Sequence, residues 1–374
     1  MDFIDLKTQN KKIRIKLEKR FKSIMNSGKY ILGPEVNELE QKLESYVGVK
    51  HCITCSSGTD ALMIALMAKG IGSGDAIITS PFTYISTAEA IAMLGATPIF
   101  CDIYPKTYNL NPEKLQKAYD FAKNKGLKPK AIIPVNLFGL PARYRLIREF
   151  ANLNNLFIIE DAAQSFGASI SNKKACSFGD FSATSFFPTK PLGAYGDGGA
   201  IFTDNDEMAI KMRSIRVHGS GKDKYDNIRL GINGRFDTIQ AAVILEKLKI
   251  FDIELINRNK IALTYNKELN QNIIKPFIPK GYNSSWALYS ILSKDKLERD
   301  KLVSFLNSNQ IPCMIYYKKA LHLMKVFKYL NYKEGDFPIS EDISNRIFSI
   351  PIHPYLNKKN QSYVIDKLNS FYNN

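Results

Sequence analysis

The stretch that decides the fold is "FGDFSATSFFPTKPLGAYGDGGAIFTD", residues 178–204, in which Lys190 stands among aromatic, small and glycine residues. No carboxylate lies within six residues of this lysine, so it is poorly placed for a local ion pair. Mostly apolar surroundings disfavour the ammonium form, which lowers the pKa of the amine and makes it nucleophilic. The alternative is a lysine whose stem lies on apolar surface while its head reaches water. The segment alone leaves both interpretations open.

Outward from this stretch, short apolar runs alternate with helical patterns. The runs "HCITC" (51–55) and "AIITS" (76–80) have the pattern of strands. The runs "AIIPVNLFG" (131–139) and "LFIIED" (156–161) have the character of strands buried on both faces of a parallel sheet. Helical patterns over 60–69 and 86–94 separate the first of these runs from later ones. The alternation predicts a layered α/β domain with right-handed crossovers.

The character of the sequence changes after a long helix expected over 237–251. The run "SWALYSILS", a helix around 296–309 and a final helix near 359–372 predict a small α+β domain. We therefore expect a large domain over 1–254 and a small C-terminal domain over 255–374.

The composition is that of an ordinary globular protein, with 374 residues, 45% hydrophobic and 24% charged. No apolar run approaches the roughly 20 residues that span a bilayer, and the start does not resemble a signal peptide, so we expect a cytoplasmic protein without a membrane partner. The net charge of +16 is spread along the chain without a nucleic-acid motif, which favours a solvated basic surface or an anionic substrate over nucleic acid. Five scattered cysteines and four histidines without ligand spacing predict neither disulfides nor a metal site.

Two further segments place polar groups where strands end. In "CSSGTDALMIAL" a strand ends at Cys55, and a turn through Gly58 leads into a helix from Thr59, whose free N–H groups can bind an anion. In "IIEDAAQSFGA" Asp161 directly follows an apolar strand. Burying a carboxylate there costs free energy unless a cation or a strong hydrogen-bond donor pairs with it. A capped helix start is the simpler interpretation of each segment.

The three features together are more specific than each alone. An anion cradle, a carboxylate at a strand end and a lysine 29 residues later are the three groups that hold pyridoxal 5′-phosphate (PLP). Its phosphate needs N–H donors, its ring nitrogen needs a carboxylate to stay protonated, and its aldehyde needs an amine.

Six segments carry a resemblance to a known family. In order and residue type, the chain resembles the DegT/StrS-type sugar aminotransferases, PLP enzymes of fold type I, in "CSSGTDAL", "PFTYISTAEAI", "GATPIFCDI", "IIEDAAQSFGA", "SFFPTKPLGAYGDGGAIFT" and "GINGRFDTIQAA". The resemblance implies a large domain with a mostly parallel seven-stranded sheet between helices and a small α+β C-terminal domain. It also implies a homodimer with shared active sites.

The resemblance further implies a role for each matching residue. Lys190 would hold PLP covalently and, once released, move the proton of the reaction, while Asp161 would pair with the pyridinium nitrogen. The other residues expected to contact the cofactor are Ser57, Gly58, Thr59 and Ser185 at the phosphate, Tyr84 on the ring face, Gln164 at the 3-oxygen, and Asn233 from the partner subunit. The residues expected to face the substrate are Arg235, His218, Tyr316 and Tyr317.

The details of the motifs suggest a substrate class. Lys190 speaks against the dehydratases of the family, which carry histidine there, and Asp197 stands where members that aminate C4 more often have glutamate. The resemblance therefore implies transfer from L-glutamate to C3 of a nucleotide-linked 3-ketosugar, with UDP-2-acetamido-2-deoxy-3-oxo-D-glucuronate as the best candidate. Such enzymes serve O-antigen and related lipopolysaccharide synthesis in bacteria. The segment "IYYKKALHL" departs from a His-Tyr-Pro segment usual in these relatives, which leaves the sugar open.

Other functions are compatible with parts of the pattern. An aminotransferase acting on another 3- or 4-keto UDP or dTDP sugar would share every cofactor residue. A nucleotide-binding oxidoreductase would share the α/β fold, but the G-x-G-x-x-G fingerprint is absent. A PLP-binding sensor would differ from the enzyme in lacking turnover.

Overall fold

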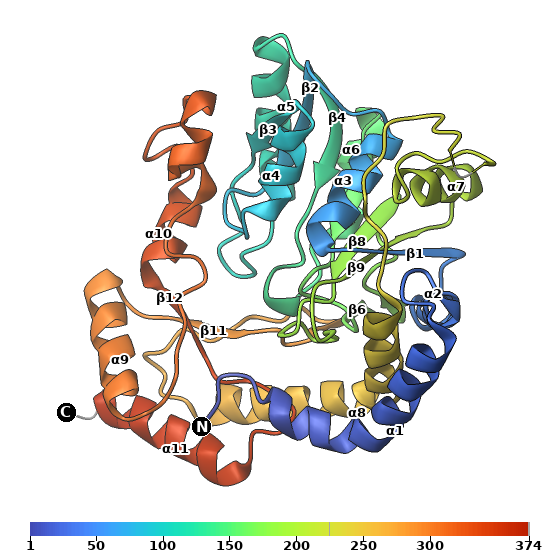
Figure 1. Cartoon of the computed structure of the whole chain (residues 1–374). Coiled ribbons are helices and arrows are strands. Elements are labelled where there is room, and N and C mark those ends of the chain that lie inside the picture. Colours follow the sequence, from blue (N-terminus) through green and yellow to red (C-terminus); the bar gives the residue numbers. More distant parts are fainter. Residues whose placement is uncertain (224, 373–374) are drawn as a thin grey trace.

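Seven strands form one mostly parallel sheet in the computed structural model, which describes residues 1–223 and 225–372 (Figure 1). The strand order is β1-β9-β8-β5-β4-β2-β3, and β9 alone runs antiparallel to both of its neighbours. This confirms the predicted large-domain architecture. The strands are β1 His51–Cys55, β2 Asp75–Thr79, β3 Thr97–Phe100, β4 Lys128–Ile133, β5 Phe157–Asp161, β8 Phe181–Ser185 and β9 Gly199–Thr203.

Helices cover both faces of this sheet, because successive strand residues point to opposite sides. Ile159 of β5 packs in the core with α3, α4 and α7, whereas its neighbour Ile158 packs in the core with α5 and α6. The helices around the sheet are α2 Pro34–Val47, α3 Gly58–Ala68, α4 Ser86–Met93, α5 Leu115–Asn124, α6 Tyr144–Leu153 and α7 Asp206–Ile215.

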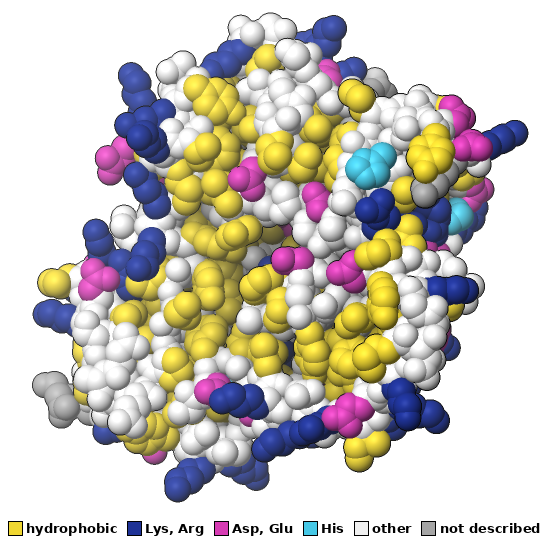
Figure 2. Space-filling model, viewed as in Figure 1, with side chains coloured by type: hydrophobic (Ala, Val, Ile, Leu, Met, Phe, Trp, Pro, Cys, Tyr) yellow, Lys and Arg dark blue, Asp and Glu magenta, His cyan; other side chains and the backbone are white. Residues whose placement is uncertain are grey.

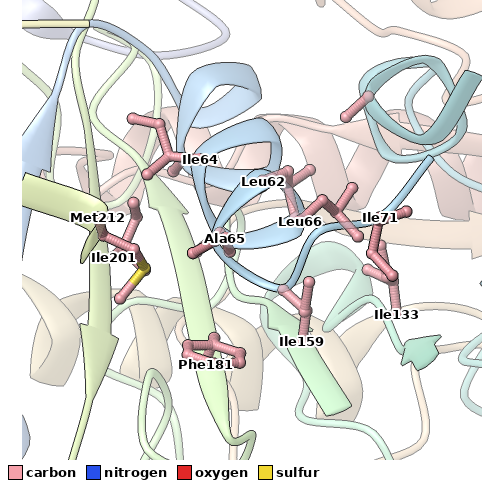
Figure 3. Close-up of a cluster of buried hydrophobic side chains, with 14 of the residues drawn as sticks. Leu62, Ile64, Ala65, Leu66, Ile71, Ile133, Ile159, Phe181, Ile201 and Met212 are labelled. Carbon is pink, nitrogen blue, oxygen red and sulfur yellow. The ribbon is translucent and has the colours of Figure 1, made fainter. Parts of the chain in front are cut away.

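Helix α3 leads into the candidate site and buries six of its 11 residues. Figure 3 shows Leu62, Ala65 and Leu66 of this helix in one apolar cluster with Ile159 of β5. Each leucine or isoleucine side chain of this kind contributes roughly 1.5–3 kcal/mol when fully buried. The packing therefore fixes where the first turn of α3 stands at the edge of the sheet.

The C-terminal elements build a second core of their own, around side chains such as Tyr289 and Phe348. Strands β11 and β12 pair antiparallel within it. The predicted helices over 296–309 and 359–372 correspond to α9 and α11. The elements of this unit are α9 Lys296–Ser308, α10 Pro338–Arg346, α11 Lys358–Phe371, β11 Tyr289–Leu292 and β12 Ile347–Ile350.

Helix α8, Thr238–Glu268, connects the two cores (Figure 1). The sequence predicts this helix only to residue 251, and the structure extends it because Tyr265 is buried in the second core. Phe251 still packs in the core of the large domain, against α2. The division proposed between residues 254 and 255 falls inside this helix, near the point where its packing partners change.

The N-terminal helix α1, Leu6–Ser27, lies against α8. Its apolar residues Ile13, Leu17 and Ile24 pack there, because their spacing of four and seven residues places them on one face of the helix. A small antiparallel sheet of β6 Ser169–Ile170, β7 Lys173–Lys174 and β10 Tyr282–Asn283 completes the fold. In the described ranges, no helix combines the length and the apolar character needed to cross a bilayer.

Candidate active site

Most of the predicted cofactor residues converge at one edge of the sheet. Strands β1, β5 and β8 run in the same direction, so their carboxyl ends meet there. Asp161 ends β5, Ser185 ends β8, and Ser57 follows β1 by two residues. Tyr84 lies in the loop after β2, which runs in the same direction. Open α/β sheets bind their ligands at this edge.

Asp161 has a buried carboxylate that neutral donors hold in place. Thr87 Oγ1 donates to Oδ2 at 2.8 Å, and the Ala163 N–H donates to Oδ1 at 3.2 Å. Burial raises the pKa of the Asp161 carboxyl, while these two bonds and the attraction of Lys190 oppose the rise. The side chain is thus fixed in orientation, and an adjacent cation would favour its charged form.

Lys190 lies in the loop after β8 and is half-buried. Burial lowers the pKa of its amine, and the attraction of Asp161 opposes the change. Among the described residues, no ion pair within 4.0 Å joins the two groups. The amine and the carboxylate therefore interact electrostatically without forming an ion pair, which leaves each group free to contact a ligand.

The start of α3 forms a cradle with the end of β8. Ser57 caps the helix by accepting a hydrogen bond from the Asp60 N–H at 3.0 Å. A Cβ on Gly58 would lie 2.7 Å from Cβ of Ser185, so only glycine permits this close approach. The first N–H groups of the helix, including that of Thr59, face outward from the helix end, as an anion such as phosphate requires. The cradle fits the phosphate of PLP.

Aromatic residues from the loop after β2 and from the C-terminal unit meet beside these groups. The rings of Tyr84 and Tyr317 lie 6.4 Å apart between centroids. Gln164 Nε2 donates to the Tyr317 hydroxyl at 3.0 Å, and its Oε1 accepts from the Phe138 N–H at 2.7 Å. Tyr316 packs against Tyr317. The predicted substrate residues of the C-terminal unit therefore stand next to the predicted cofactor residues.

The remaining predicted residues share a separate loop. Asn233 forms a backbone bridge with Val217, the neighbour of His218. Both Asn233 and His218 are exposed, and Arg235 is half-buried. The Gly234 carbonyl accepts from the Ser56 N–H at 3.1 Å, so this loop lies beside the start of α3. Within the part of the chain that the structure describes, the loop's three side chains make no hydrogen bond to Lys190 or Asp161.

A buried ion pair anchors that loop and was not foreseen from the sequence. Arg216 Nη1 donates to Glu40 Oε1 at 2.8 Å and to the Thr54 carbonyl at 2.8 Å, while the Arg216 carbonyl accepts from the Gly234 N–H. Glu40 belongs to α2 and looks like a solvent-facing helical residue in the sequence, so no signal marks it. Thr87 was also missed, although the cost of burying Asp161 calls for such a donor.

Charged side chains are distributed over the surface. On the face shown in Figure 2, Lys and Arg side chains stand mainly along the outline, and hydrophobic side chains gather toward the middle. Across residues 1–223 and 225–372, no group of three or more His, Cys, Asp or Glu side chains could hold a metal ion.

Comparison with known sequences identifies close similarity over nearly the whole chain. The sequence model of the DegT/DnrJ/EryC1/StrS aminotransferase family matches residues 11–369. The UDP-2-acetamido-2-deoxy-3-oxo-D-glucuronate aminotransferase of Pseudomonas aeruginosa is 43% identical over 357 residues, which cover 95% of this chain and 96% of that protein.

Solved structures show the same architecture. A DegT DnrJ EryC1 StrS aminotransferase from Brucella abortus superposes with a TM-score of 0.96 at 47% identity, covering 100% of both chains. NtdA from Bacillus subtilis, solved with bound cofactor PMP, superposes with a TM-score of 0.89 at 28% identity, covering 100% of this chain and 83% of that one. PMP is the aminated form of PLP.

Proposed function

Because the chain belongs to the DegT/DnrJ/EryC1/StrS aminotransferase family, we propose that it moves an amino group from L-glutamate to C3 of a nucleotide-linked 3-ketosugar. It is a sugar aminotransferase that uses PLP. UDP-2-acetamido-2-deoxy-3-oxo-D-glucuronate is the best candidate substrate, since the name of the 43% identical Pseudomonas aeruginosa relative specifies it. The amino sugar would serve bacterial surface polysaccharides such as O-antigen, and we propose that the enzyme works in the cytoplasm.

The observation that supports this proposal is that Lys190 and Asp161 lie near enough for their charges to interact, while no ion pair within 4.0 Å joins them among the described residues. PLP, when bound, supplies an electron sink for the reaction. Asp161, held by Thr87, would keep a proton on the ring nitrogen. The lowered pKa of Lys190 favours a neutral amine, which can bond to the cofactor aldehyde. After its release from the cofactor, Lys190 Nζ would take the proton from the α-carbon of the amino donor. It would deliver this proton to C4′ of the cofactor.

The other contacts would orient the cofactor. The N–H groups of Gly58 and Thr59, with the hydroxyls of Ser57 and Ser185, would bind the phosphate at the start of α3. Tyr84 would stack on the ring face.

Gln164 would reach the ring's 3-oxygen, and its contacts in the structure allow this second task. Its Nε2 carries two hydrogens, so the bond to Tyr317 leaves one of them for the cofactor. The hydrogen bond from Gln164 to Tyr317 would thereby join a cofactor-binding residue to a substrate-binding one.

We further propose a homodimer in which Asn233 reaches the phosphate of the partner subunit. The loop that carries it also exposes Ile228 and Leu230, with 55% and 89% of their surfaces accessible. Exposed apolar side chains grouped in this way mark interaction surfaces. Arg235 and His218 on the same loop, together with Tyr316, would meet the sugar nucleotide.

The assignment is tested by cofactor attachment and by turnover. The purified protein should absorb visible light with PLP, and borohydride reduction should leave the cofactor mass on Lys190. Lys190→Ala should lose both the colour and the transfer from glutamate to the UDP-3-ketosugar. Amination of a 4-ketosugar in preference to the 3-ketosugar would replace the proposed substrate, and attachment at another lysine would refute the role of Lys190.

Mixed dimers test the shared site. Lys190→Ala and Asn233→Asp subunits should each be inactive, the second because its carboxylate repels the phosphate. Co-expression should restore activity, because one site of a mixed dimer then contains neither substitution. If mixed dimers stay as inactive as the parents, Asn233 acts on its own subunit.

A further inference from the structure

Helix α8 binds the backbone just beyond Lys190 through two side chains. Gln240 Oε1 accepts from the Tyr195 N–H at 2.8 Å, and Lys247 Nζ donates to the Gly193 carbonyl at 2.6 Å. The two side chains are seven residues apart, so they lie on the same face of the helix. The segment after Lys190 is thus fastened at two points to a helix of the large core.

Lys247 is an unusual residue for this task because it is buried. Only 1% of its surface is accessible, and the Gly193 carbonyl is its hydrogen-bond partner. The ring of Tyr195 lies 4.5 Å from Nζ. The carboxylate of Glu254 attracts it from a distance but accepts its own hydrogen bonds from Gln9 and Tyr355.

Such a burial is costly. No carboxylate lies within 4.0 Å of Nζ among the described residues, and burial lowers the pKa of the Lys247 amine to about 8. A methionine or leucine would fill the same space without this cost. The amine is therefore explained by the carbonyl that it binds, not by packing.

The loop that Lys247 holds is tight. The Lys190 N–H donates to the Phe187 carbonyl at 2.9 Å. A Cβ on Gly193 would lie 2.5 Å from the Pro188 carbonyl oxygen and 2.6 Å from that of Phe187. The chain thus doubles back on itself between residues 187 and 193, with Lys190 inside the turn. A displacement of Gly193 would be passed on to Lys190.

We propose that Lys247 is a positioning residue, which sets the place of the Lys190 amine opposite Asp161 through its hydrogen bond to the Gly193 carbonyl. The inference rests on the role proposed for Lys190. Lys247 itself does not touch the reacting groups. Its effect is to hold the turn in the one arrangement that aims the amine at the cofactor aldehyde.

The test compares three variants by the rate at which apo-protein bonds PLP at Lys190. The rate is followed by visible absorbance and by the mass fixed at Lys190 after borohydride reduction. Lys247→Met keeps the length of the side chain but removes the donor, and should slow attachment by up to about a hundredfold, since misplacement of about 1 Å can cost that much. Lys247→Arg keeps a donor on a longer side chain and should give an intermediate rate. Lys249→Met, a partly exposed neighbour paired with Glu246, should match the wild type.

A purely structural role predicts a different result. Lys247→Met would then have a lower melting temperature but, while folded, the wild-type attachment rate and the wild-type pH midpoint of the visible absorbance. That outcome would overturn the inference. If Lys247→Met does not fold, Lys247→Arg decides the question. A wild-type PLP attachment rate and a wild-type pH midpoint in Lys247→Arg would also overturn the inference. A wild-type protein that does not bond PLP at Lys190 would instead refute the proposed role of Lys190.

Discussion

At the scale of single residues, the site depends on neutral groups that keep charged ones in place. Asp161 is held by the hydroxyl of Thr87 and by one N–H, with no cation in contact among the described residues. Lys247 is held by one carbonyl and an aromatic ring. Neutral donors fix the direction of a carboxylate without cancelling its charge, so the charge remains available to a ligand.

Thr87→Val should weaken PLP binding. Removal of the hydroxyl leaves Asp161 with a single donor and should raise the pKa of this carboxyl further above its ordinary value. The loss of a donor to a buried acceptor costs about 1–3 kcal/mol, so the dissociation constant of PLP should rise by roughly 5- to 150-fold. Fluorescence titration of apo-protein with PLP measures the change.

Thr87→Ser serves as the matched control, because it keeps the hydroxyl. An affinity near that of the wild type is expected for it. Equal weakening by serine and valine would show that the methyl group, not the hydrogen bond, supports the site.

At the scale of elements, the sequence predicts what local pattern dictates. Strands such as 51–55 and the helix at 86–94 follow from buried apolar runs and clear stops. Lys190 and Asp161 could be proposed as site residues because each is a costly residue in apolar surroundings. Lys247 and Glu40 could not, because a charged residue in an amphipathic helix ordinarily faces water. Only the packing of distant elements buries them.

The first turn of α3 offers a test at this scale. Gly58→Ala would place a methyl group 2.7 Å from Cβ of Ser185, which must force the helix start and the end of β8 apart. We expect the affinity for PLP and for free phosphate to fall together by at least about tenfold, since displaced N–H groups no longer converge on the anion. Isothermal titration of apo-protein with each ligand measures both.

Gly72→Ala is the control for this substitution. Its new methyl group would meet only the Leu94 carbonyl oxygen, at 3.8 Å, so both affinities should stay unchanged. A Gly58→Ala protein that retains full affinity would place the phosphate elsewhere.

At the scale of the whole molecule, buried polar groups join the N-terminus to the C-terminal unit. His353 is 4% exposed, and its Nδ1 has no hydrogen-bond partner among the described residues. Glu254 of α8 accepts hydrogen bonds from Gln9 of α1 and Tyr355 near the C-terminus. Arg258, one turn further, donates to the Trp286 and Ile352 carbonyls. Segments far apart in the sequence thus share one polar junction.

This junction should make the protein sensitive to acid. Burial and the charge of Arg258 lower the pKa of His353 to about 4, from 6.5 in an unfolded chain. Between these values the unfolded chain binds a proton that the folded protein does not, so the free energy of unfolding falls as the pH drops. The loss from this group is about 3 kcal/mol at most and is complete below about pH 4.

Denaturant unfolding at about pH 7 and about pH 4.5 measures the effect, since these values lie on either side of most of that titration. His353→Gln should lose less stability between the two values than the wild type, because glutamine does not titrate. Identical losses in the two proteins would contradict this origin of the acid sensitivity.

The continuity of α8 limits which insertions and deletions this helix can accept. Its 31 residues contain neither glycine nor proline and extend roughly 46 Å at 1.5 Å per residue. Lys247 in its first third and Tyr265 in its last turn must each face a particular direction. Deleting one residue between them would rotate everything beyond by about 100°. Insertions and deletions in α8 should therefore be tolerated only in steps close to whole helical turns, because only these keep the direction of the side chains beyond the change.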